Sequence, residues 1–112
     1  MRRVDELLRE VIAGEVARLK DPGLGFVTIT GVKTSPDLRA ARVYYSVLGE
    51  DDQKAATAAA LERAGGRIRA ATGTQVRIKY LPELHFVLDE AVERGIRIDQ
   101  LLRDLAEEGE EE

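Results

Sequence analysis

The stretch LERAGGRIRAA, residues 61–71, places two adjacent glycines inside a segment that otherwise has the composition of a helix. Glycine costs about 1 kcal/mol relative to alanine at an interior helical position. We therefore expect the helix to break at Ala64, Gly65 and Gly66 and to resume at Arg67, which gives a kinked pair of helices. Gly73 is expected to cap the second of them. The residues before the break, 54–63, are rich in alanine, which lets the first helix lie close against a sheet.

Two segments before this helix pair have the composition of strands, residues 26–32 and 42–48. The first is rich in β-branched side chains, and apolar side chains alternate in the second. The turn residues Ser35, Pro36 and Asp37 lie between them, so that two antiparallel strands are predicted.

A third strand is predicted after the helix pair. Residues 76–80 alternate between apolar and polar or basic side chains, as in a strand with one solvent-exposed face. Pro82 interrupts this pattern before residues 84–88 continue it. If Val76, Ile78 and Tyr80 face the core, Arg77 and Lys79 project from the opposite face of the strand.

The two ends of the chain are predicted to be helical. Apolar residues recur from Val4 at the spacing of one helix face, and this helix of about five turns is expected to end near Lys20, before a proline and a glycine. At the other end we predict a short helix at residues 89–94, capped by Gly95, and a last helical stretch from Asp99. The acidic segment 107–112 is too charged and too poor in apolar residues to fold by itself.

The order of these elements indicates the α+β class. Helices and strands are segregated along the chain, which favours helices on one face of a three-stranded sheet. A chain of 112 residues with 44% hydrophobic residues forms one domain with one core, which we place at residues 1–106.

The residue types exclude several kinds of chemistry. Without cysteine there is no disulfide, thiolate metal site or cysteine nucleophile. His85 is the only histidine and has no second histidine with which to bind a metal, and Ser35 and Ser46 lie in no nucleophile motif. No phosphate-binding loop or membrane-spanning run is present. We therefore predict a cytoplasmic protein that is not an enzyme and has no metal, cofactor or membrane partner.

The charge is distributed unevenly. The formal net charge is -4, but five acidic residues lie in the last six positions, and residues 63–82 contain no Asp or Glu. Glycines at a helix break would let a phosphate backbone approach free peptide N–H groups at the start of the next helix. The sequence thus predicts an RNA-binding surface made of a small-residue break and the cations around it. Its residues are Arg63, Ala64, Gly65, Gly66, Arg67, Arg69, Arg77 and Lys79.

Two considerations limit this hypothesis. Arginines on solvated helix faces are common, so the fold also fits a protein-interaction module whose Ala-rich helix or sheet edge near Pro82 binds a partner protein. The chain also has only five aromatic residues, and we assign Phe26, Tyr45 and Phe86 to the core. Recognition of RNA by shape and backbone is therefore favoured over stacking of single-stranded bases.

Several segments resemble the ribosome-binding factor A family in their order and spacing. They are KDPGLGFVT (residues 20–28), SPDL (35–38), ARVYYSVLG (41–49) and YLPELHFVLDE (80–90). The resemblance spans nearly the whole chain, from Arg2 to Leu102. Gly23 differs from the arginine that many members have, so no RNA contact is assigned to that position.

The resemblance implies a KH-like domain of the type II topology, in which an Ala-x-Gly kink between helices replaces the usual Gly-x-x-Gly loop. Residues 64–66 occupy that place. It also implies a bacterial, non-catalytic protein, which we expect to be a monomer. Such a protein binds the free small ribosomal subunit, assists late maturation of 16S rRNA and supports growth in the cold.

Overall fold

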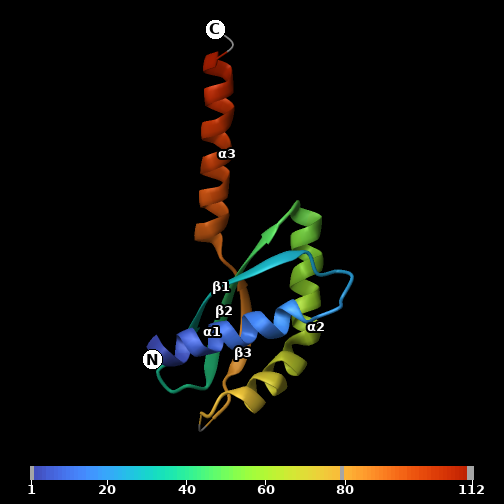
Figure 1. Ribbon diagram of the computed structural model, residues 1–112, viewed down its shortest axis with the longest axis vertical. Coiled ribbons are helices and arrows are strands. Elements are labelled where there is room, and N and C mark those ends of the chain that lie inside the picture. The colour runs from blue at the N-terminus through green and yellow to red at the C-terminus, as the bar shows by residue number, and fades with distance from the viewer. Residues whose placement is uncertain (1, 79, 111–112) are drawn as a thin grey trace.

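The computed structural model describes residues 2–78 and 80–110 (Figure 1). The elements follow the order α1 (Arg2–Ala17), β1 (Phe26–Thr34), β2 (Ala40–Leu48), α2 (Asp51–Gln75), β3 (Glu83–Leu88) and α3 (Glu90–Glu110). The predicted α+β class is confirmed. Lys79, one of the predicted site residues, lies outside the described residues.

The sheet has the order β1-β2-β3 and is mixed. β1 and β2 pair antiparallel, whereas β3 runs parallel to β2 from Ala40↔Glu83 to Tyr45↔Leu88. The register of β1 shifts between Ile29 and Gly31, so that Thr30 forms a bulge. α1 and α2 cover one face of this sheet, as predicted (Figure 1).

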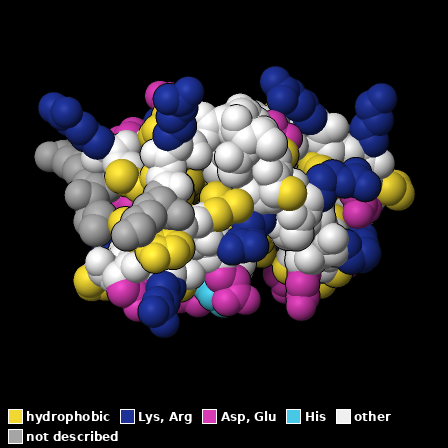
Figure 2. Space-filling model, turned by 90° about the horizontal axis from the view of Figure 1, so that it is seen from below, with side chains coloured by type: hydrophobic (Ala, Val, Ile, Leu, Met, Phe, Trp, Pro, Cys, Tyr) yellow, Lys and Arg dark blue, Asp and Glu magenta, His cyan; other side chains and the backbone are white. Residues whose placement is uncertain are grey.

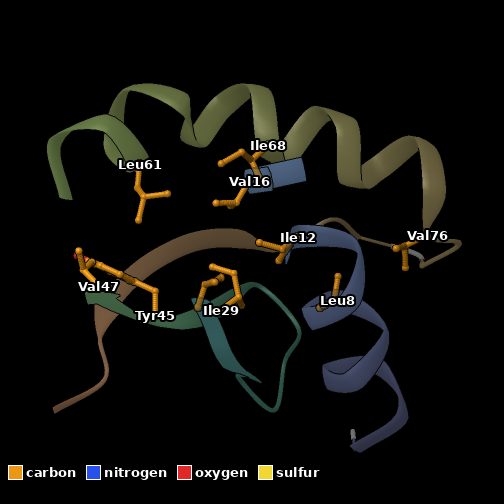
Figure 3. Close-up of a cluster of buried hydrophobic side chains, with 10 residues drawn as sticks. Leu8, Ile12, Val16, Ile29, Tyr45, Val47, Leu61, Ile68 and Val76 are labelled. Atoms are coloured by element: carbon orange, nitrogen blue, oxygen red, sulfur yellow. The ribbon is translucent and has the colours of Figure 1, made fainter. Parts of the chain in front are cut away.

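The core lies between that face and the two helices (Figure 3). α1 contributes Leu8, Ile12 and Val16, whose spacing of four residues places them on one side of the helix. The inward side chains of β2 alternate along the strand, and α2 supplies Leu61 and Ile68. The apolar side chains of the two helices and of the sheet therefore form one continuous layer.

α2 is one helix rather than a pair. Every residue from Asp51 to Gln75 is helical, so that no break occurs at Ala64, Gly65 and Gly66, although the ribbon changes direction along its length (Figure 1). The predicted cap at Gly73 is also wrong, because the helix continues to Gln75. A Cβ added at Gly73 would lie 3.0 Å from Leu81 Cδ2, so glycine lets the following loop approach the helix closely.

The strand predicted at residues 76–80 is not present in the described part of that segment. Val76 is buried and Ile78 partly buried, as expected, but they lie in a loop. The tip of this loop exposes Tyr80, and Pro82 is buried. The reason is register: β2 begins at Ala40, opposite Glu83, and therefore offers no pairing partner to the residues before Glu83.

α3 is likewise one helix, which passes through the predicted cap at Gly95 and extends to Glu110, within the segment expected to be unfolded. It projects from the sheet along the long axis of the molecule (Figure 1). For this reason the radius of gyration is 16.7 Å, larger than the roughly 13 Å of a compact chain of this length.

One of the three aromatic residues assigned to the core is exposed instead. Phe26 is 81% exposed, whereas Tyr45 is buried and Phe86 packs against the core. Phe26 stands opposite Leu48, which is also exposed, at the end of the β1–β2 ladder. The side chains of these two residues lie outside the apolar layer.

Candidate nucleic-acid interface

The loop between α1 and β1 is fastened to the middle of α2. The Asp21 carboxylate accepts hydrogen bonds from the Gly23 N–H at 2.9 Å and from Arg63 Nη2, at 3.2 Å to Oδ1 and 3.0 Å to Oδ2. Both hydrogen bonds lower the pKa of the Asp21 carboxyl, the one from the Gly23 N–H more than the one from Arg63. Further along, the Gly25 N–H donates to the buried Thr57 hydroxyl at 3.1 Å. These bonds hold the segment 21–25 against the helix beside Ala64.

A hollow of about 420 Å³ lies between this loop and α2. Its lining contains three cations, Lys20, Arg63 and Arg67, and one carboxylate, that of Asp21. Arg63 is neutralised by its ion pair with Asp21. Lys20 and Arg67 are exposed and form no hydrogen bond or ion pair with any residue that the structure describes. Two uncompensated positive charges therefore border the hollow.

Gly65 and Gly66 face a different hollow, of about 460 Å³, on the side of α2 toward β3. Arg69 lines it together with two acidic side chains, Glu62 and Glu83. The Arg69 guanidinium donates to the carbonyl of Pro82 from Nε at 3.0 Å and to that of Leu81 from Nη2 at 2.7 Å. Arg69 therefore fastens the loop before β3 to the helix, and its surroundings are of mixed charge.

The predicted site residues thus fall into separate groups. Arg63, Ala64 and Arg67 lie on one hollow, whereas Gly65, Gly66 and Arg69 lie on the other. Arg77 is exposed in the loop after α2, and Lys79 is outside the described residues. Seen from the end opposite α3, Lys and Arg side chains gather mostly along one edge, and acidic side chains accompany the histidine at the other (Figure 2).

One part of the predicted mechanism is wrong. Because α2 continues through Gly66 and Arg67, no helix begins there, and the peptide N–H groups at that point lie inside the helix. What the glycines provide is a helix surface without side chains. Sequence reasoning also missed Lys20, whose only signal was a cation directly before the Asp-Pro-Gly turn.

The structure bears on two other kinds of site as well. The described residues hold no group of three or more His, Cys, Asp or Glu side chains placed to bind a metal ion. Among residues 2–78 and 80–110, no helix combines the length and apolar character needed to cross a membrane.

The mixed sheet with two helices on one face, one of them carrying adjacent glycines and a hollow on either side, defines a KH-like α+β domain. Residues 1–102 match the family model of ribosome-binding factor A. The chain belongs to the ribosome-binding factor A family. It is 45% identical over 107 residues to "Ribosome-binding factor A" of Geobacter sulfurreducens, an alignment covering 95% of this chain and 91% of the relative.

Solved structures agree with this assignment. The crystal structure of ribosome-binding factor A from Thermus thermophilus is 31% identical and superposes with a TM-score of 0.71 over 78% of this chain and 92% of that one. A homology model of Thermus thermophilus RbfA, fitted into a cryo-EM map of a 30S–RbfA complex, is 32% identical. It has a TM-score of 0.64 and covers 77% of this chain and 91% of that one.

Proposed function

We propose that this protein binds the free small ribosomal subunit and assists late maturation of its 16S rRNA without making or breaking covalent bonds. The observation that carries the proposal is the family membership, together with the Thermus relative fitted into a map of a 30S complex. We propose that it acts in the cytoplasm as a monomer, with its greatest effect during growth in the cold.

The hollow beside Ala64 supports a contact with the RNA backbone. Lys20 and Arg67 border it and carry charges that no described acidic side chain neutralises. Phosphates are the natural partners of such charges, and a side-chain-poor helix surface lets a backbone come close. Lys20, Arg63, Ala64 and Arg67 form the centre of the proposed contact.

The other predicted residues extend this contact around α2. Gly65 and Gly66 would leave room for the RNA on the second side of the helix. Arg69 keeps free donors after binding two carbonyls, because a guanidinium has five N–H groups. Arg77, exposed in the next loop, and Lys79 complete the proposed set.

The test replaces two cations and follows subunit binding. Lys20→Gln with Arg67→Gln should lower the affinity of the purified protein for free small subunits in gradient sedimentation. It should also reduce the slope of log affinity against log salt by about 1.4 to 1.8, the amount expected for two lost phosphate contacts. The matched control, Arg9→Gln with Arg103→Gln, removes the same charge from α1 and α3. Equal slopes in the two variants would exclude the hollow as the contact.

A second candidate function is that of a protein-interaction module. Leu101, Leu102 and Leu105 of α3 are each more than half exposed, which is unusual for leucines that have no partner. This function predicts that the protein stays with the subunit, or with another partner, after RNase treatment. Release by RNase supports the RNA-binding proposal instead.

A further inference from the structure

The face of the sheet that points away from α1 and α2 carries two cationic side chains and the histidine in one row across the three strands. Lys33 of β1 pairs with Arg42 of β2, and Arg42 pairs with His85 of β3. All three are exposed. They share a face because the alternate residues of β2, such as Ala41 and Val43, are buried against the helices.

This row is electrostatically costly in the isolated protein. Like charges directly opposite each other on neighbouring strands destabilise a sheet. In the described part of the chain neither Lys33 nor Arg42 has a carboxylate within ion-pair distance. Glu83 lies on the same face, but its register partner is Ala40. A bound anion would remove this repulsion.

An aromatic platform lies directly beside the cations. In the next outward-facing row Tyr44 is flanked by Gly31 on β1 and Val87 on β3. Tyr44 is partly buried and Val87 exposed, and a Cβ placed on Gly31 would meet nothing within 4 Å. The ring of Tyr44 therefore has open space on the β1 side. The two rows are two residues apart, or about 7 Å, so one ligand can reach both.

The far end of the same face differs in character. The exposed pair Phe26 and Leu48 lies there. Between it and Tyr44, the Thr30 hydroxyl donates to the Asp89 carboxylate at 2.6 Å, and this bond lowers the pKa of Asp89. The Asp89 carboxylate is thus hydrogen-bonded to Thr30 and forms no ion pair with Lys33 or Arg42. Positive charge on this face is concentrated at Lys33 and Arg42, whereas His85 has the exposed Glu83 two residues away on the same face.

A hollow of about 310 Å³ opens at the end of the cationic row. Its lining includes Lys33 and Arg42 together with the turn residues Ser35 and Pro36. The two cations therefore border a concave surface. A phosphate group bound there would lie next to the platform formed by Tyr44 and Gly31.

We propose that this open sheet face is a second nucleic-acid contact, which binds a short single-stranded RNA segment. A base stacks on Tyr44 over Gly31, and Lys33, Arg42 and His85 hold the adjoining phosphates. The segment must be single-stranded because the bases of a duplex are already stacked and offer no free face. This inference rests on the proposed function, which brings the protein to rRNA, but it concerns a surface on the opposite side of the sheet from α2.

The test measures binding of a fluorescent 12-nucleotide oligouridine to the full-length protein by anisotropy at low salt. Tyr44→Leu keeps apolar bulk but removes the ring, and it should weaken binding about tenfold, whereas Tyr44→Phe should bind like the natural protein. Lys33→Gln with Arg42→Gln should lower the salt slope by about 1.4. Arg9→Gln with Arg103→Gln is the control of equal charge.

The outcomes separate this proposal from the previous one. If Tyr44→Leu and Lys33→Gln/Arg42→Gln both bind oligouridine like the control, the sheet face is not an RNA site, even when the protein still sediments with small subunits. If binding falls as expected but sedimentation with small subunits never occurs, the proposed function fails while the sheet-face site stands. Unlabelled competitors test the preference for a single strand. If an acidic peptide and a duplex RNA of the same length displace the fluorescent oligouridine as well as unlabelled oligouridine does, the face is a general anion site and the single-strand preference is overturned.

Discussion

Gly65 and Gly66 occupy the middle of a continuous helix, where glycine is intrinsically unfavourable. Neither is required by crowding: the nearest neighbour of an added Cβ at Gly65 is Phe86 Cε2 at 4.0 Å, and at Gly66 nothing lies within 4 Å. Neither has a positive φ. The protein thus forgoes helix stability at a place where packing does not demand it, which favours a role in binding.

Replacing both glycines by alanine should therefore have opposite effects on stability and on binding. We expect Gly65→Ala with Gly66→Ala to raise the free energy of unfolding by about 1 to 2 kcal/mol, from the difference in helix propensity. The same change should weaken small-subunit binding, because two methyl groups cover the bare surface. Chemical denaturation and gradient sedimentation measure the two quantities.

Gly14 provides the matched control for this prediction. It also lies inside a helix, α1, and an added Cβ there meets nothing within 4 Å. Gly14→Ala should stabilise the protein by about 0.5 to 1 kcal/mol and leave subunit binding unchanged. If the double variant is stabilised and still binds normally, the glycine pair has no part in the interface.

Secondary-structure elements were predicted correctly where the local sequence pattern determines them, and wrongly where pairing with a distant strand does. α1, β1 and β2 follow from apolar periodicity and turn residues, and the structure confirms them. The segment 76–80 has the alternation of a strand, but a strand needs a partner, and the register of β2 provides none before Glu83. That register depends on long-range pairing, which the local sequence does not contain.

The prediction of a helix break at residues 64–66 is wrong because the free energy of side-chain burial exceeds the cost of the two glycines. Two interior glycines cost about 2 kcal/mol together. Leu61 and Ile68, on either side, are fully buried against the core, and each such side chain contributes roughly 1.5 to 3 kcal/mol. Burial of both in one helix outweighs the glycine cost, so the helix continues and bends.

The base of α3 is held by an ion pair between elements far apart in the sequence. Lys54 Nζ of α2 lies 2.6 Å from Glu93 Oε2 of α3, with 20% and 11% of the two side chains exposed. Glu93 Oε1 also accepts a hydrogen bond from the Val47 N–H at 3.4 Å. Three elements, α2, β2 and α3, therefore meet at one carboxylate.

Lys54→Met should destabilise the protein because it leaves the Glu93 carboxylate without its cation. We expect a loss of about 2 kcal/mol, less than for a fully buried pair, together with faster proteolysis of α3. Adding Glu93→Gln to Lys54→Met should restore part of the stability. Arg9→Met, which removes one partner of the exposed Arg9–Glu6 pair, is the control and should cost less than about 1 kcal/mol. If Lys54→Met loses no more stability than Arg9→Met does, the Lys54–Glu93 pair does not hold α3 in place.

At the scale of the molecule, the sequence predicted which cations are available but not how they divide over the surface. Arg63 and Arg69 belong to the predicted basic stretch, yet Arg63 forms an ion pair with Asp21, and Arg69 donates hydrogen bonds to two backbone carbonyls. Lys20, Lys33 and Arg42 lie outside that stretch, and only the fold places them on a hollow or across a sheet. Surface charge depends on tertiary neighbours, which a single sequence does not show.

The projecting end of α3 carries most of the excess negative charge of the protein. Asp89 and Glu93 hold its first turns, whereas residues 101–106 are all exposed. The segment 99–112 carries seven acidic residues and one arginine, so removing it changes the formal net charge from -4 to +2. Its contribution to the protein is therefore more electrostatic than structural.

Truncation after Ile98 should leave the domain folded and strengthen its attraction to RNA. Because no described side chain between Leu101 and Ala106 is buried, we expect the melting temperature to stay within about 3 °C of the full chain. Affinity for oligouridine should rise at low salt, and the gain should shrink near 0.15 M salt, where the screening length is about 8 Å. A full-length variant with glutamine at residues 107, 108 and 110–112 should show part of the same gain, since it removes five of the charges but keeps the helix. A fall in melting temperature of about 10 °C after truncation would instead mean that α3 packs against the body, and its exposed leucines would then belong to the core.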